Sequence, residues 1–504
     1  MRVHFRGIAL VLMFPLGIWA AMATQGPGVP GSPKPEAPPI PSDDKGKAES
    51  DRSTIPVAWT TAVEPKPISP SAKRGLDWLV EHQLKDGGWG QGDESQQMGG
   101  GAELRDKPNV ADTSIAALAL IRSGSTPSSG PYKDAIARAA RYVRSQVDSS
   151  DSQSLDVSTV KGTRVQGKLG PNIDTFLASL FLAEVKDRMG DPEGNKSLDV
   201  ALNKVLGKIK AHQKADGSWD NRTGWAPILA QSMAGKGINR AAQNGAMVDG
   251  ALLARTEDFA VAQFASTSAP ASGGVVSADS DLGVAAKAAA PVAGKPPTVV
   301  ALTDGVAASP AGGPTAVLRS SRAGGMGMMG GGMGSGRMGS AGVELYDRAS
   351  SLAVLSDSVN SNATLEADLR KKVETSKDEK EVSEAKDKLK RFEVTKLACA
   401  EAQEAVVRRL EDKAFIAGFG SNGGEEFLSY MNIGESLVLK GGPEWKKWDV
   451  SMTENLNRIQ NDDGSWTGHH CITGRTFCTS TALLVLLCDR TPIPARAKDK
   501  PLAK

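Results

Sequence analysis

The chain has 504 residues, of which 40% are hydrophobic, and its 60 Lys and Arg nearly balance 58 Asp and Glu, for a net charge of +2. A chain of this length can bury a large core, whereas its near-neutral charge argues against the basic face that a nucleic-acid partner would need. The 55 glycines and 28 prolines indicate low-complexity segments between globular ones.

Residues 1–23 are typical of a cleaved signal peptide. Two arginines precede an apolar run over residues 8–19, and residues 21–23, Ala-Met-Ala, place small side chains at the cleavage positions. An uncleaved anchor is the alternative, but the run is shorter than the roughly 20 apolar residues of a transmembrane helix. No later segment is apolar enough to cross a membrane. We therefore expect an exported protein, periplasmic or extracellular, in a compartment that permits disulfides.

Three segments have compositions that disfavour a packed core, and we expect them to be disordered. Residues 24–68 form a Pro-rich tether, residues 263–342 an insertion rich in Ala, Ser, Gly and Met, and residues 493–504 a tail. Five methionines near the end of the insertion could serve as soft copper ligands. A glycine linker that tolerates methionine explains them more simply.

The remaining sequence is predicted to be helical, without strands. Residues 69–83 open with Ser and Pro and space apolar residues on one face, and the helix over 112–124 is expected to start on an Asp cap. A single charged helix is predicted over 363–415. We expect i,i+4 charge pairs to hold it, because it lacks a sustained apolar seam for a coiled-coil partner.

A short pattern occurs three times, as QLKDGGW, QKADGSW and QNDDGSW, each time between two amphipathic helices. Gly after Asp permits a turn with positive φ, Gln can satisfy backbone groups exposed at the helix end, and Trp can fill the space between helices. The three copies consist of Gln83, Asp86, Gly87 and Trp89; Gln213, Asp216, Gly217 and Trp219; and Gln460, Asp463, Gly464 and Trp466.

This pattern resembles the QW motif of the terpenoid cyclase and protein prenyltransferase superfamily, the squalene–hopene cyclase-like repeat. The resemblance implies an all-α fold, an (α/α)6 toroid of six helical hairpins with its halves at residues 69–262 and 343–492. Outer helices would begin near residues 69, 131, 196, 239, 363 and 443, and their inner partners near 111, 171, 223, 343, 424 and 474. With its Gly/Met-rich insertion, the chain is also similar to exported prenyltransferase/squalene oxidase repeat proteins of planctomycete-type bacteria.

The catalytic signatures of related toroids are absent. The chain lacks the DxDD motif with which cyclases protonate an alkene, the DxC zinc motif of protein prenyltransferases and the CGEQ motif of complement-like thioester domains. Aromatic residues make up only 5% of the chain, too few for a pocket that guides carbocations.

We therefore expect a non-catalytic protein that binds an unidentified protein partner or an apolar ligand. Two alternatives stay open. One is an enzyme that acts on a lipid, isoprenoid or polysaccharide in the toroid cavity, and the other is a structural scaffold that uses the charged 363–415 helix.

The best candidate site follows the third tryptophan, in HHCITGRTFC. His469, His470, Cys471 and Cys478 are ligand types suitable for zinc, with Arg475 beside them, although their spacing is not that of a standard finger. A Cys–His nucleophile pair, a Cys471–Cys478 disulfide and buried free thiols are the other interpretations. No cofactor beyond this candidate zinc is predicted.

Polar residues also stand at the starts of the expected inner helices, where helix N-termini would open onto one end of the cavity and carry partial positive charge. These residues are candidates for ligand binding at the cavity mouth, although N-capping is the alternative for the aspartates. They are Asp112, Thr113, Asp174, Thr175 and Thr479.

Overall fold

The computed structural model describes residues 59–95, 102–220, 224, 226–268, 335–418 and 422–494. All of them belong to one compact unit, residues 55–504. The described residues are mainly helical, so the expected all-α class is confirmed. Among them, no helix combines the length and the hydropathy needed to cross a bilayer. The predicted signal peptide and most of the predicted tether and insertion lie outside the described residues.

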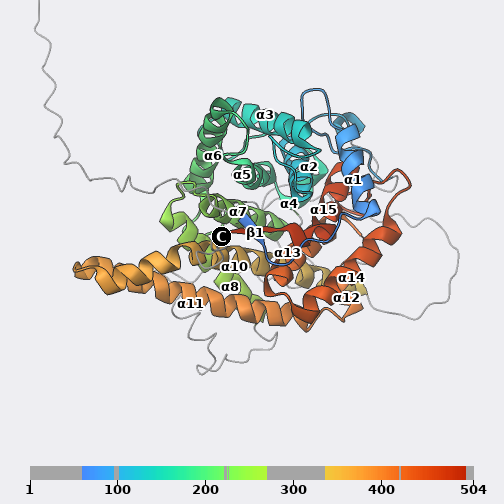
Figure 1. The fold of residues 1–504 in the computed structure, drawn as a ribbon. Helices are drawn as coiled ribbons and strands as arrows, with labels where there is room; N and C mark the ends of the chain where they lie inside the picture. The colour runs from blue at the N-terminus through green and yellow to red at the C-terminus, as the bar shows by residue number, and fades with distance from the viewer. Residues whose placement is uncertain are drawn as a thin grey trace, which may run out of the picture. The chain divides into compact units, whose positions relative to one another are not determined.

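Six helices contact one another in a closed order (Figure 1): α2 with α5, α5 with α7, α7 with α10, α10 with α13, α13 with α15, and α15 with α2. Every residue of α2 and α5 is buried, which explains why their sequences are apolar on all sides. The six are α2 (Val110–Arg122), α5 (Ile173–Val185), α7 (Pro227–Gln243), α10 (Ser335–Thr375), α13 (Gly424–Lys440) and α15 (Arg475–Leu486).

A second set of helices packs against these six by one face. In α6, for example, Leu198, Leu202, Val205 and Ile209 are buried at a spacing of three and four residues, as expected for an amphipathic helix. The set consists of α1 (Pro70–Glu81), α3 (Lys133–Ser149), α6 (Pro192–His212), α8 (Gly250–Ser268), α11 (Glu379–Val407) and α14 (Gly442–Ile459). Shorter pieces occupy the connections: α4 (Arg164–Leu169), α12 (Lys413–Ile416), η1 (Ala102–Leu104) and η2 (Cys488–Arg490).

The three Gln–Trp segments form three turns with the same internal bonds, and all three indoles are buried. In each, the indole N–H donates to a carbonyl ten residues earlier, that of Leu79, Ile209 or Leu456, at 2.7–2.9 Å. The Gln amide donates to the glycine carbonyl, and the Asp carboxylate accepts the N–H two residues later. We call these segments the tryptophan turns.

Each tryptophan turn also holds a helix outside its own pair. The Gln83 amide donates to Ala135 of α3, the Gln213 amide to Thr256 of α8, and the Gln460 amide to Ser71 of α1. The third turn therefore connects the last part of the described chain to its first helix. Glycine is required there, because φ of Gly464 is +91° and a Cβ would lie 3.0 Å from the Arg74 carbonyl.

The segment before α1 and the segment after α15 are also joined. Strand β1 (Trp59–Thr61) pairs antiparallel with β2 (Pro492–Pro494), and the backbone N–H of Lys66 donates to Asp489 at 2.7 Å. The predictions of no strand and of disorder at 59–68 and 493–494 were wrong. The bounds predicted for the insertion, 263–342, were also wrong, because α8 continues to residue 268 and α10 begins at residue 335.

The prediction of one charged helix over 363–415 was wrong as well. A three-residue turn separates α10 from α11, which begins at Glu379, and the two helices lie side by side (Figure 1). The break occurs because Asp378 caps α11 by accepting the N–H groups of Lys380 and Glu381. We call this pair the α10–α11 hairpin.

Three predicted helix starts, near residues 239, 343 and 363, are displaced: the corresponding helices begin at Gly250, Ser335 and Glu379. Residue 239 lies inside α7, which ends before Gly245, a residue with φ of +74°. The predicted Asp cap at 112 was also wrong. Asn109 caps α2 by accepting the N–H of Asp112.

Candidate functional site

Two of the threonines predicted at the cavity mouth hold tryptophan turns. Thr113 Oγ1 accepts the backbone N–H of Trp89 at 2.9 Å, and Thr479 Oγ1 accepts that of Trp466 at the same distance. Both threonines are fully buried. Their hydroxyls are therefore engaged in the fold.

Two further predicted residues also make structural contacts. Thr175 Oγ1 donates to the Leu155 carbonyl at 2.8 Å, and Arg475 pairs with Asp463 of the third tryptophan turn. The ion pair therefore holds the Arg475 side chain, at the start of α15, against the third tryptophan turn.

The two predicted aspartates lie fully buried in the first turns of α2 and α5. Asp174 accepts the Ala111 N–H at 3.1 Å and the Gln166 amide at 2.8 Å, and so links α5 to the first turn of α2. Asp112 accepts the Asn109 amide at 2.7 Å through Oδ2. Burial raises the pKa of Asp112 to about 7 and also raises that of Asp174.

Two adjacent carboxylates are buried in the first turn of α13. Glu425 Oε2 accepts the Ile472 N–H at 3.1 Å, and Glu426 Oε1 accepts the Tyr346 hydroxyl of α10 at 2.6 Å. Burial, and then the charge of Glu426, raise the pKa of Glu425 to about 7. The start of α13 is thus fastened both to the segment before α15 and to α10.

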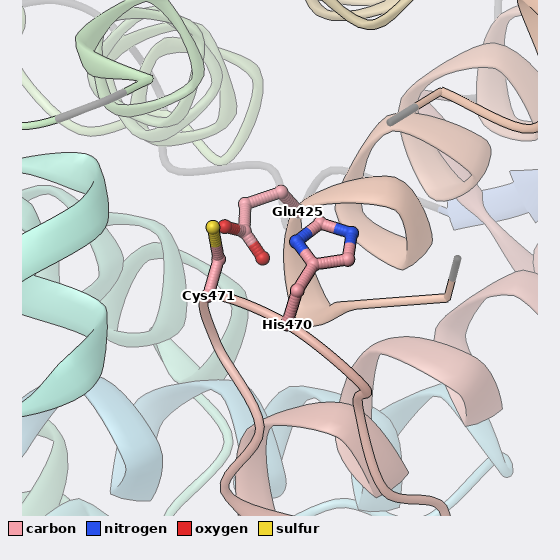
Figure 2. Close-up of side chains that lie close together, drawn as sticks. All are labelled: Glu425, His470 and Cys471. Atoms are coloured by element: carbon pink, nitrogen blue, oxygen red, sulfur yellow. The ribbon is translucent and has the colours of Figure 1, made fainter. Parts of the chain in front are cut away.

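The segment before α15 brings His470 and Cys471 to these carboxylates. His470 Nε2 lies 3.3 Å from Glu426 Oε2. Figure 2 shows the side chains of Glu425, His470 and Cys471 directed toward one another, and one ligand atom of each lies within 4.8 Å of the other two. Cys471 has φ of +57°, a conformation that few non-glycine residues adopt. Hydrogen bonds to Cys471 and to Glu426 raise the pKa of His470 to about 11.

The other two residues predicted near this segment point elsewhere. His469 is exposed, and its backbone N–H donates to the Asn422 carbonyl at 2.7 Å. Cys478 is buried in α15, and its thiol donates to the Ile472 carbonyl at 3.3 Å. All four cysteines are free thiols, so the disulfide considered between Cys471 and Cys478 is not formed, because their side chains have different partners.

A carboxylate, an imidazole and a thiol in one group could hold a transition metal. His470 and Cys471 were candidates from the sequence, whereas Glu425, Glu426 and Tyr346 were missed as members of their site. No local signal identifies these three, because they lie on other helices and only tertiary packing brings them to the His–Cys pair.

A second group of charges fills the interior between the closed set of helices. Glu435 accepts from Lys236 at 2.6 Å and from Arg122 at 3.0 Å. We call the whole group the central ion cluster; its members are Arg122, Glu184, Lys236, Arg240, Asp357 and Glu435, three cations and three anions with side chains at most 8% exposed. Burial by itself would raise the pKa of Glu435, but Lys236 and Arg122 lower it to about 2.

The cavity at this cluster has a volume of about 10 Å³, enough for about one water molecule. Its lining is charged and aliphatic, with residues from α2, α5, α7, α13 and α15. The sequence carries a signal for the cluster, because single charges interrupt apolar helices, as in FLAEV for Glu184 and IGESLVL for Glu435. Buried charges of this kind require partners.

No protein-family model, curated protein or solved structure matches the chain. Membership of the terpenoid cyclase and protein prenyltransferase superfamily therefore stays a prediction from the tryptophan turns.

Proposed function

We propose that this chain is an exported, non-catalytic α/α-toroid protein that binds a protein partner through its surface. Two observations support the toroid: the closed order of helix contacts and the three tryptophan turns with identical bonds. The composition of residues 1–23 supports export.

The central ion cluster is the observation that favours a surface partner over an apolar ligand. Small-molecule sites have volumes of about 300–1,000 Å³ and mostly apolar walls, whereas the central cavity measures about 10 Å³ and is lined by five charged residues. An apolar ligand there would have to separate buried ion pairs, and unpaired buried charges are costly.

This proposal predicts that the purified mature protein will not bind lipids in its centre. A fluorescent long-chain fatty acid and a polyprenol should give no saturable binding and no rise in melting temperature, since neither fits beside the cluster. A fatty-acid-binding protein provides the positive control. One-to-one binding of either probe at micromolar concentration would contradict this proposal and would instead support an apolar ligand or substrate in the toroid cavity.

The export proposal has its own test. Expressed from its full sequence in a Gram-negative host, the protein should be recovered from the periplasm with Thr24 as its first residue, as read by intact-mass spectrometry. Recovery from the cytoplasm with an uncleaved N-terminus would contradict export.

The α10–α11 hairpin is the surface that we propose for the partner, because most side chains between residues 367 and 390 are exposed and charges of both signs alternate there. Crosslinking in the native host, followed by mass spectrometry, should give partner crosslinks at the hairpin lysines Lys371, Lys372, Lys386 and Lys388. Partner crosslinks confined to other helices would place the surface elsewhere.

A further inference from the structure

We infer that Glu425, His470 and Cys471 form a binding site for a zinc-class divalent transition metal, with one coordination position open to solvent. This inference does not depend on the proposed function. It rests on the convergence of three different ligand types and on the contacts that orient them.

The three ligand atoms lie close enough together to bind one metal ion after small side-chain movements. Their ligand atoms all lie within 4.8 Å of one another, and ligand atoms around a tetrahedral zinc ion lie roughly 3.5 Å apart, given metal–ligand bonds of about 2.0–2.3 Å. Side-chain rotations that move the ligand atoms by about 1 Å would therefore bring them to the spacing of a zinc site. As Figure 2 shows, Glu425 approaches from α13 and the His–Cys pair from the opposite segment.

The ligands are oriented by further contacts, as in natural metal sites. His470 Nε2 lies 3.3 Å from Glu426 Oε2. The other ring nitrogen, Nδ1, therefore faces the proposed metal position (Figure 2). Glu426 is itself held by the Tyr346 hydroxyl at 2.6 Å. Glu425 is anchored through Oε2 by the Ile472 N–H, which holds the carboxylate in place for the metal.

The ligand chemistry selects the metal. Thiolate and imidazole ligands favour zinc and the other late first-row transition metals over magnesium and calcium, which prefer oxygen ligands. On binding, a divalent ion would displace the protons of the His470 imidazole and the Cys471 thiol to solvent, and it would offset the negative charges of Glu425, Glu426 and the resulting thiolate. Three protein ligands leave a fourth position for water or another ligand, as in catalytic rather than structural zinc sites. The ion can enter from solvent, because the His470 side chain is 22% exposed.

The test uses the full mature chain, stripped of metal by chelation. We expect one Zn²⁺ per chain in a competition titration with a chromophoric chelator, and no competition from Mg²⁺ or Ca²⁺. Co²⁺ should bind at the same stoichiometry and show thiolate-to-cobalt charge-transfer absorption. This spectrum tests the thiolate ligand in the unmodified protein, so it does not depend on whether any variant folds.

Matched variants locate the site. His470→Ala and Cys471→Ser should each weaken Zn²⁺ binding at least tenfold, and Cys471→Ser should remove the cobalt charge-transfer band. His469→Ala is the control, because the neighbouring histidine is exposed and contributes only its backbone, and it should bind Zn²⁺ like the original chain. Circular dichroism checks the fold of each variant.

Several outcomes would overturn the inference. They are the absence of stoichiometric Zn²⁺ binding, a cobalt complex without thiolate absorption, binding that survives both ligand variants, and an equal loss in His469→Ala. None of these outcomes bears on the proposed surface partner, whose tests use lipids and crosslinks.

Discussion

The buried carboxylates differ in which side chains lie beside them, and this difference sets their charge. Glu435 contacts Lys236 and Arg122, and its pKa is lowered to about 2. Asp112 has an amide neighbour, Asn109, and its pKa is raised to about 7. A cation compensates the loss of hydration that burial imposes, whereas a neutral amide compensates it only in part.

Asp112 should therefore make the protein less stable as the pH rises. Its folded pKa is raised from 3.8, so the folded state holds the proton more tightly than the unfolded state. Stability from this group is then full below about pH 4 and falls until about pH 7, by up to about 4 kcal/mol. Asp112→Asn should show a smaller fall than the original chain, as measured by urea denaturation across that range, because Asp174 and Glu425 also have raised pKa values.

The exposed Asp368 on α10 provides the control, because Asp368→Asn should keep the pH profile of the original chain. If the profiles of Asp112→Asn and the original chain run parallel, Asp112 does not carry the proton.

At the scale of elements, the tryptophan turns combine local and distant contacts. The indole, glutamine and aspartate bonds within each turn span at most ten residues, so a short sequence suffices to specify them. The contact of each turn with a further helix depends on close backbone approach. Gly217, with φ of +84°, would place a Cβ against the Arg255 carbonyl of α8.

Gly217→Ala should consequently destabilise the protein by about 2–4 kcal/mol, from backbone strain at positive φ and from displacement of α8. The matched control is Gly207→Ala on the preceding helix α6, where a Cβ meets nothing within 4 Å. That change should stabilise by about 0.5–1 kcal/mol, because alanine favours the helix. Chemical denaturation of both variants provides the measurement, and equal effects would show that the turn makes no close approach.

At the scale of the described unit, the central ion cluster joins helices that are distant in sequence. Glu435 of α13 binds Lys236 of α7 and Arg122 of α2, and Lys236 also binds Asp357 of α10 at 3.1 Å. The cluster replaces an apolar core at the point where these helices meet. We expect the cluster to favour this set of neighbouring helices, because a buried charge without an opposite charge beside it is costly.

Glu435→Gln should destabilise the protein by about 3–5 kcal/mol, since it leaves two buried cations short of a negative charge. Glu454→Gln, at an exposed position on α14, should change stability by less than about 0.5 kcal/mol. Because the pKa of Glu435 is lowered from 4.5 to about 2, its stabilisation should be lost only as the pH falls through that interval. This pH dependence is opposite in direction to that of Asp112. If Glu435→Gln is as stable as the original chain, Glu435 does not stabilise the fold through its two cations.

The sequence by itself determined the helical class, the three tryptophan turns and the starts of most helices. The signals for these features, such as a glycine that permits positive φ or apolar residues at helical spacing, act within about ten residues. Where local signals competed, the predictions were wrong: the Asn–Gly stop of α7 and the Asp378 cap of α11 were read as helix interior.

Only the tertiary structure decided which side chains meet. Glu425 lies beside His470 and Cys471, and Glu435 beside Arg122 and Lys236. These partners are so far apart in the sequence that a helical or strand periodicity does not indicate their contact. Two of the three threonines expected at a cavity mouth, Thr113 and Thr479, instead hold tryptophan turns. The physical reason is that the charge and reactivity of a buried group depend on its neighbours in space, and helix packing selects those neighbours.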